Sequence, residues 1–129
     1  MNTAYRVWDG EQMHYWDDPG LSLEIKGDIW ILWREEGRGC RVSIAESHEE
    51  GTALMWGIGL KDKNIREIYE GDVREDRRGD ILTVVYENDF ASFVAKYNNR
   101  GRVPLDIWGV DSEFLGDVYQ NPELLEVAE

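Results

Sequence analysis

The chain has 129 residues, of which 42% are hydrophobic, and its six tryptophans and six tyrosines supply enough apolar side chain for a packed core. The 14 Lys and Arg against 27 Asp and Glu give a formal net charge of −13, which argues against nucleic-acid and membrane partners, because both are anionic. One cysteine excludes an internal disulfide, and no apolar run reaches membrane-spanning length, so we expect a cytoplasmic protein.

The first part of the chain predicts short strands joined by tight turns. Residues 5–8 and 12–16 are rich in aromatic and β-branched side chains. Asp9-Gly10 between them is a strong hairpin signal, because glycine accepts the positive φ of a tight turn. Residues 21–26 then alternate apolar and polar side chains, which predicts a half-buried strand.

Residues 29–33 (Ile-Trp-Ile-Leu-Trp) are apolar at every position. Such a strand is either covered on both sides within the chain or has an outer face that contacts another subunit. We take the tryptophans of this N-terminal part as candidate interface residues, the alternative being a dense aromatic core. They are Trp8, Trp16, Trp30 and Trp33. We expect self-association with Trp30 or Trp33 at the contact.

The middle and the end of the chain are also rich in strand signals. Residues 40–45 alternate again, which predicts a strand that starts with Cys40 as a buried or half-buried structural thiol. Strands are predicted over residues 81–86, 90–97 and 113–119. Residues 121–125 (Asn-Pro-Glu-Leu-Leu) predict one short C-terminal helical turn, with Asn as the cap and Pro at the first helical position. The fold class is mainly β.

A glycine-punctuated stretch over residues 55–73 connects the two β-rich halves. Its polar tip, residues 61–64 (Lys-Asp-Lys-Asn), is turn-prone because Asp and Asn side chains bond their own backbone. We expect a structural and not a catalytic role for the stretch, with glycines at backbone conformations that alanine does not reach cheaply. Its candidate structural residues are Gly59, Asp62, Asn64, Tyr69, Gly71 and Asp72.

These residues carry a family resemblance. Residues 59–64 and 67–72 resemble the signature of the YopX-like phage protein family, Gly-Leu-Lys-Asp-Lys-Asn-Gly-x-Glu-Ile-Tyr-Glu-Gly-Asp, with Ile65 where that family usually has glycine. Residues 5–9 and 115–125 resemble its opening and closing motifs. The resemblance implies a phage or prophage origin, a small fold with an SH3-like barrel, and no established activity.

Together these signals divide the chain into two regions. We expect a β-hairpin-rich N-terminal region over residues 1–53 and an SH3-like barrel region with a C-terminal extension over residues 54–129, packed as one compact unit. The spacing of short strands and turns over residues 54–97 independently fits a small barrel.

Few residues are candidates for catalytic or metal chemistry. Cys40 with His48 could make a nucleophile–base pair, but such pairs are usual only in clefts, and Cys40 is expected to open a strand. His14 is distant from His48 in the sequence, and Cys40 has no second cysteine, so a structural zinc site is not expected. We expect no cofactor, no metal and no enzymatic activity, with a hydrolase-type enzyme as the remote alternative.

The leading hypothesis is therefore a non-enzymatic, homo-oligomeric protein-binding module in the interior of a host cell. Its partner is an unnamed host or phage protein, and an acidic chain is able to imitate nucleic acid and occupy a basic host protein. The other alternative is a protein that sequesters a small ligand in an aromatic pocket at a subunit interface.

Overall fold

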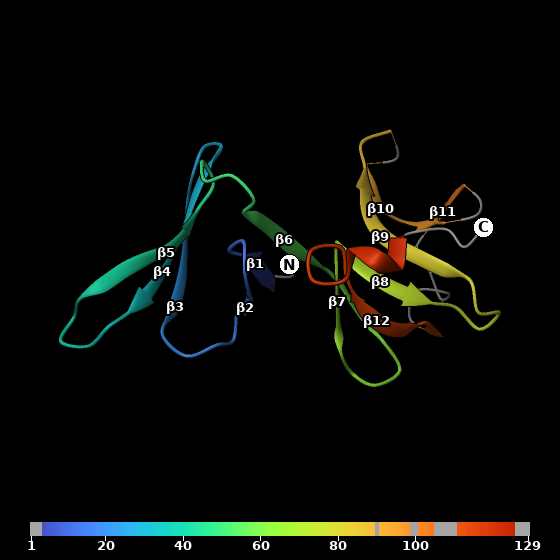
Figure 1. The fold of residues 1–129 in the computed structure, drawn as a ribbon, viewed down its shortest axis with the longest axis horizontal. Helices are drawn as coiled ribbons and strands as arrows, with labels where there is room; N and C mark the ends of the chain where they lie inside the picture. The colour runs from blue at the N-terminus through green and yellow to red at the C-terminus, as the bar shows by residue number, and fades with distance from the viewer. Residues whose placement is uncertain (1–3, 90, 99–100, 105–110, 126–129) are drawn as a thin grey trace. The chain divides into compact units, whose positions relative to one another are not determined.

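The computed structural model describes residues 4–89, 91–98, 101–104 and 111–125, and these residues are almost entirely β (Figure 1). The predicted mainly-β class is confirmed. Phe90 of the predicted 90–97 strand, Trp108 and the last residues of the chain lie outside the described residues. The chain forms two compact units, Ala4–Trp56 and the described residues from Gly57 on, whereas the sequence pattern placed the division after residue 53.

The N-terminal unit contains two antiparallel sheets. In the first, β1 (Tyr5–Trp8) lies between β2 (Met13–Tyr15) and the start of β6 (Ala53–Lys61). In the second, β4 (Ile29–Glu35) lies between β3 (Leu21–Lys26) and β5 (Arg41–Glu46). The β1–β2 hairpin is the one predicted from Asp9-Gly10.

The core of this unit lies between the two sheets and is centred on Val7, Leu32 and Ala45. Trp30 packs against the same core, so the Trp30–Leu32 side of β4 faces inward. Because side chains alternate along a strand, Ile29, Ile31 and Trp33 project from the opposite side. We call these three residues the outer face of β4.

The C-terminal unit is built on a five-stranded antiparallel sheet in the order β11-β10-β9-β8-β12. Its strands are β8 (Asp72–Glu75), β9 (Ile81–Glu87), β10 (Ser92–Tyr97), β11 (Arg102–Pro104) and β12 (Glu113–Asp117). The end of β6 pairs with β7 (Glu67–Tyr69) to form a separate hairpin. The core contains Ile68 from β7 with Leu82, Val84, Ala95 and Tyr97 from the sheet. The sheet curls into a half-barrel, and the closed SH3-like barrel expected from the family resemblance is not confirmed.

The predicted C-terminal helical turn is confirmed as a short 3-10 helix, η1 (Pro122–Leu125). The N–H of Leu124 donates to the carbonyl of Asn121 at 3.0 Å, so Asn121 lies at the start of the turn as expected. Asn98 at the end of β10 donates to the Leu124 carbonyl at 3.1 Å and ties the helix to the sheet. Within the described ranges, no helix is both long enough and apolar enough to cross a membrane.

Candidate functional site

The glycine-punctuated stretch forms the β6–β7 hairpin, and Asp62 organises its tip. Asp62 Oδ1 accepts the backbone N–H groups of Asn64 at 2.9 Å and Arg66 at 3.0 Å. The N–H of Ile65 donates to the Asp62 carbonyl at 2.9 Å, which closes the turn. Ile65 adopts φ 63°, so this β-branched residue holds the left-handed conformation that glycine reaches more readily.

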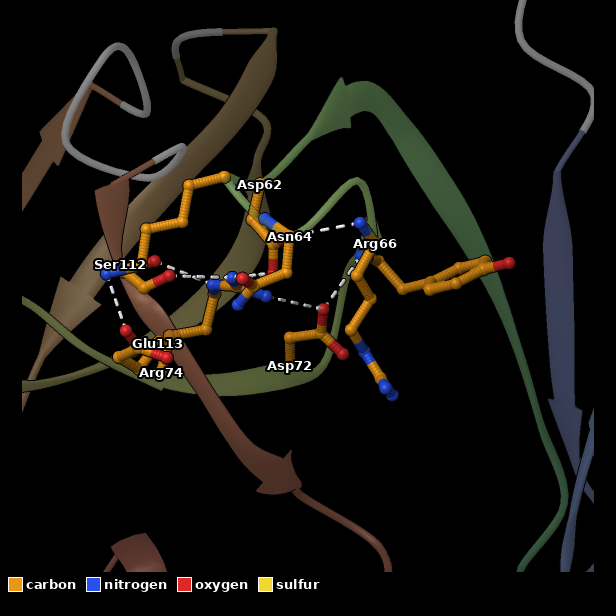
Figure 2. Close-up of polar contacts among 9 residues, drawn as sticks. Asp62, Asn64, Arg66, Asp72, Arg74, Ser112 and Glu113 are labelled. Carbon is orange, nitrogen blue, oxygen red and sulfur yellow. Dashed lines mark hydrogen bonds and ion pairs between the residues drawn. The ribbon is translucent and has the colours of Figure 1, made fainter.

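Arg74 of β8 lies behind this tip and connects it to the rest of the unit (Figure 2). Its Nη2 donates to Asp62 Oδ2 at 2.6 Å and to the Ser112 carbonyl at 2.9 Å. Its Nε donates to Ser112 Oγ at 2.6 Å, and its Nη1 lies 3.6 Å from Asp72 Oδ2. One guanidinium therefore joins the hairpin tip, the start of β8 and the residue before β12.

This network is closed to solvent. The side chains of Arg74 and Asp62 are 0% and 1% exposed. Burial by itself raises the pKa of Asp62, but the hydrogen bond from Arg74 and those from the backbone N–H groups outweigh it, and the pKa is lowered. Both side-chain oxygens of Asp62 and the Nε and Nη2 groups of Arg74 are hydrogen-bonded, whereas Arg74 Nη1 has no hydrogen-bond partner among the described residues. A buried network of this kind fits a role in holding the tip in place.

The sequence reasoning missed this centre. It assigned no structural role to Arg74, which is fully buried. The signal lay in the strand itself: β8 places Arg74 directly after Val73 in a run of buried residues, and a cation there requires a carboxylate partner.

The structural residues predicted from the sequence lie in this hairpin and in the corner that follows it. Gly59 and Gly71 both adopt φ 88°, the kind of backbone conformation expected of them. The N–H of Gly71 donates to the Val84 carbonyl at 2.7 Å, and Asp72 Oδ2 accepts the N–H of Tyr69 at 2.9 Å. The corner thus fixes where β8 starts; the assignment of these residues to a structural role stays a prediction.

The four candidate interface tryptophans do not form one surface. Trp30 packs toward the core, and Trp33 lies on the outer face of β4. Trp8 alternates with the core residue Val7 and therefore projects away from the core, and Trp16, after β2, is 45% exposed. Of the four, only Trp33 belongs to the outer face of β4.

Trp33 is held in place by two polar neighbours. Its Nε1 donates to Glu24 Oε1 at 3.0 Å, and the guanidinium of Arg41 lies 4.1 Å from its ring centre. Ile29 at the start of the same row is 57% exposed. The outer face of β4 is therefore an apolar row between charged side chains of β3 and β5.

Comparison with known proteins identifies the family. The family model described as YopX protein matches residues 4–126. The chain belongs to the YopX protein family. It is 43% identical to the SPbeta prophage-derived uncharacterized protein YopX of Bacillus subtilis (strain 168), over 98% of each chain.

Solved structures agree with this assignment. The crystal structure of YopX from Bacillus subtilis matches with a TM-score of 0.76 and 39% identity over 98% of this chain and 100% of that one. Protein EF1440 from Enterococcus faecalis matches with a TM-score of 0.62 and 22% identity over 95% of this chain and 97% of that one, a likeness of fold alone.

The cysteine of this YopX-family chain is not where the sequence pattern placed it. β5 starts at Arg41, and Cys40 lies in the preceding turn, where its N–H donates to the Gly37 carbonyl at 2.9 Å. Cys40 is exposed, so the prediction of a buried or half-buried thiol is wrong.

Each histidine contacts a carboxylate. His14 Nε2 lies 2.8 Å from Asp9 Oδ2, and His48 Nε2 lies 3.3 Å from Glu46 Oε2. In the part of the chain that the structure describes, no three His, Cys, Asp or Glu side chains gather closely enough to hold a metal ion.

The C-terminal unit has an aromatic groove of about 340 Å³ between the end of β6 and the β9–β10 hairpin. Ile58 and Leu60 form one wall, and Tyr86 and Phe93 form the other. The two rings meet edge to face, with centroids 5.3 Å apart and planes at 77°. The volume of this groove falls in the range of small-ligand sites, and the groove lies within one chain.

Proposed function

We propose that the protein is a phage- or prophage-encoded, non-enzymatic protein-binding module that forms a homo-oligomer through the outer face of β4. The observation that carries the proposal is that β4 is apolar on both faces while the unit has a core on only one of them. Leu32 is 0% exposed on the core side, whereas Ile29 on the other side is 57% exposed. The prophage origin of the Bacillus subtilis relative supports the phage or prophage source.

The make-up of the outer face fits a contact between copies. The strand register places Glu24 opposite Ile31, and Lys26 opposite Ile29, so charges of both signs flank the apolar row. Charges of both signs on one face allow a self-complementary contact in which unlike charges meet across the axis. Trp33, already oriented by Glu24 and Arg41, loses little side-chain entropy on binding, as expected of an interface anchor.

The overall charge limits how such an oligomer forms. Two copies that each carry −13 repel one another, and salt screens this repulsion. The same charge favours a basic partner outside the oligomer, such as a host protein that binds nucleic acid, which an acidic surface imitates.

Light scattering at moderate salt tests the self-association. We expect the wild-type mass to be a multiple of the chain mass, and Ile29→Glu and Trp33→Glu to reduce it to one chain with the strand content unchanged. Ile25→Glu is the matched control, because Ile25 is 52% exposed but pairs with Trp30 and so belongs to the core side of the sheet. A wild-type monomer at high micromolar concentration contradicts the proposal, as does an oligomer that both variants leave intact.

The aromatic groove supports a second candidate function, the sequestering of a small ligand between the wall of Tyr86 and Phe93 and the wall of Ile58 and Leu60. Native mass spectrometry of the purified protein checks it. A retained small molecule that is lost in Phe93→Ala is the expected result, and a bare polypeptide mass at gentle ionisation conditions counts against it.

A further inference from the structure

Two hairpin tips in the C-terminal unit have the same turn geometry. In the β6–β7 tip, the Asp62 N–H donates to the Arg66 carbonyl, and Asp62 Oδ1 accepts the N–H groups two and four residues later. In the β8–β9 tip, the Asp76 N–H donates to the Asp80 carbonyl, and Asp76 Oδ1 likewise accepts the N–H groups two and four residues later.

The fourth residue of this turn is left-handed in both tips, but its identity differs. It is Gly79 at φ 86° in one and Ile65 at φ 63° in the other. Glycine adopts this conformation without steric cost, whereas a β-branched side chain there strains the backbone. The β6–β7 tip therefore has an isoleucine at the position where the β8–β9 tip has glycine, the residue that this geometry favours. Strain of this kind that the fold retains points to a function for the side chain.

Ile65 does not contribute to the core. It is 77% exposed, and of the large apolar side chains in the described residues it is the most exposed, ahead of Ile29 at 57%. The tip beneath it is rigid, because Asp62 is bonded to the buried Arg74 and the guanidinium of Arg66 lies 3.6 Å from the ring centre of Phe114 on β12. A rigid, protruding apolar side chain pays little entropy on insertion into a partner.

The surroundings of Ile65 are basic in a strongly acidic protein. Lys61, Lys63 and Arg66 are exposed around it, and the carboxylate of the tip, Asp62, is buried against Arg74. Glu113 on β12 pairs with Lys63, and the strand register places Glu67 opposite Lys61, so a carboxylate lies beside two of the three cations. The tip thus presents an exposed apolar side chain on a turn segment with three cations, while the whole chain carries −13.

We propose that Ile65 is the anchor of a protein-docking site, which we call the Ile65 tip (residues 61–66), and that its partner presents an apolar pocket rimmed by carboxylates. Insertion of Ile65 into such a pocket removes its side chain from water, and the carboxylates face Lys61, Lys63 and Arg66. This site is in a different unit from the outer face of β4, and its partner is a different protein. The docking proposal is therefore independent of the proposed self-association.

A random-peptide library tests the proposal on the whole chain. The library is selected on immobilised wild-type protein in the presence of excess soluble Ile65→Gly protein, which keeps the turn and lacks the side chain. We expect surviving peptides that combine Asp and Glu with large apolar residues. Measured one by one, they bind Ile65→Gly and Ile65→Asn at least about tenfold more weakly than wild type, since both residues accept the left-handed conformation but offer no apolar anchor.

Two control variants separate specific docking at the Ile65 tip from nonspecific hydrophobic binding. Ile29→Ser removes the next most exposed apolar side chain and should leave peptide binding unchanged, and Lys61→Glu reverses one charge of the tip and should weaken it. The proposal is overturned if no peptide survives the competition, if the survivors lack acidic residues, or if they bind Ile65→Gly as well as wild type. It is also overturned if light scattering shows that Ile65→Gly lowers the mass of the wild-type assembly, because the occupant is then a second copy of this chain.

Discussion

Arg74 and Asp62 form an ion pair at 2.6 Å between two side chains that are 0% and 1% exposed. They are 12 residues apart in the sequence, and they join the tip of one hairpin to the strand that follows it. An ion pair in this position adds little net stability when whole, but removal of one partner leaves a charge buried without compensation. The pair therefore makes the tip conformation and the fold of the C-terminal unit depend on each other.

Asp62→Ala is expected to destabilise the protein by about 3–5 kcal/mol. It leaves the buried guanidinium of Arg74 without its carboxylate partner, and it removes the acceptor for two N–H groups of the tip. Urea unfolding measures the change. Lys63→Ala is the matched control, since its pair with Glu113 is about half exposed and such pairs contribute roughly 0–1 kcal/mol. If Asp62→Ala does not fold, Asp62→Asn keeps the turn acceptor and loses only the charge. Equal stability of Asp62→Asn and wild type would contradict this account.

Acid is expected to destabilise both units. The pKa of Asp62 is lowered by Arg74 and the tip N–H groups, against the effect of burial, and the pKa of Asp9 is lowered by His14 and the N–H groups of Gln12 and Glu11, also against burial. A carboxylate with a lowered folded-state pKa stabilises the fold above its unfolded pKa, and this stability is lost as the pH falls through the folded value.

The loss should therefore begin near the ordinary aspartate pKa of 3.8 and grow below it. Urea midpoints taken from neutral pH downward measure it. Asp62→Asn and Asp9→Asn should each have a shallower acid limb than wild type, because each removes one of the linked protonations. Parallel acid limbs in all three proteins would exclude these two groups as the cause.

Ile65→Gly is expected to stabilise the protein by about 0.5–1 kcal/mol. The left-handed conformation costs a residue with a Cβ roughly 1–2 kcal/mol, and the substitution removes this cost. The greater conformational freedom of glycine in the unfolded chain offsets part of the resulting stabilisation. The opposite exchange, Gly79→Ile in the second turn of the same kind, should destabilise by about 1 kcal/mol or more. Thermal melts of the two variants decide it, and a change of the same sign in both would show that the turns are not equivalent.

The hairpins and most strands could be predicted because their causes are local. Asp9-Gly10 gives the first hairpin, and the alternation in residues 21–26 gives β3. The network around Arg74 could not be predicted this way, since Ser112 approaches it from 38 residues further along the chain. The division between the two units at Trp56 and Gly57 has no local signal in the sequence either, because β6 is one continuous strand through both residues and neither composition nor a turn marks the point.

Cys40 and Ile65 show two further limits of local reasoning. Residues 40–45 do alternate, but the N–H of Cys40 donates to a carbonyl of the preceding turn. The strand therefore starts one residue later, at Arg41. Ile65 was recognised as a departure from the family signature, yet the pattern did not decide whether the turn would change or the residue would be strained. The structure keeps the turn, because Asp62 and its partners fix it.

Gly71→Ala is expected to destabilise the protein by about 1 kcal/mol or more, because Gly71 holds φ 88° while its N–H donates to the Val84 carbonyl at 2.7 Å. Gly101→Ala is a suitable control: its backbone is not in the left-handed region, and an added Cβ meets nothing within 4 Å. A thermal melt of Gly71→Ala that coincides with wild type would show that this corner tolerates a side chain.

Duplex DNA is expected not to retain the protein, even at low salt. Binding to DNA requires cations that displace counterions from phosphates, and this chain carries −13 in total. Two of the arginines of β8 and the β8–β9 tip are already engaged: Arg74 is fully buried, and the Arg77 guanidinium lies 2.8 Å from the Asp111 carboxylate. Gel-shift assays over a range of salt concentrations measure retention. Asp111→Asn releases Arg77 and provides the sensitised control. A salt-dependent shift of the wild-type protein at micromolar concentration would mean that a local cluster, with the Ile65 tip as the first place to look, outweighs the acidic surface.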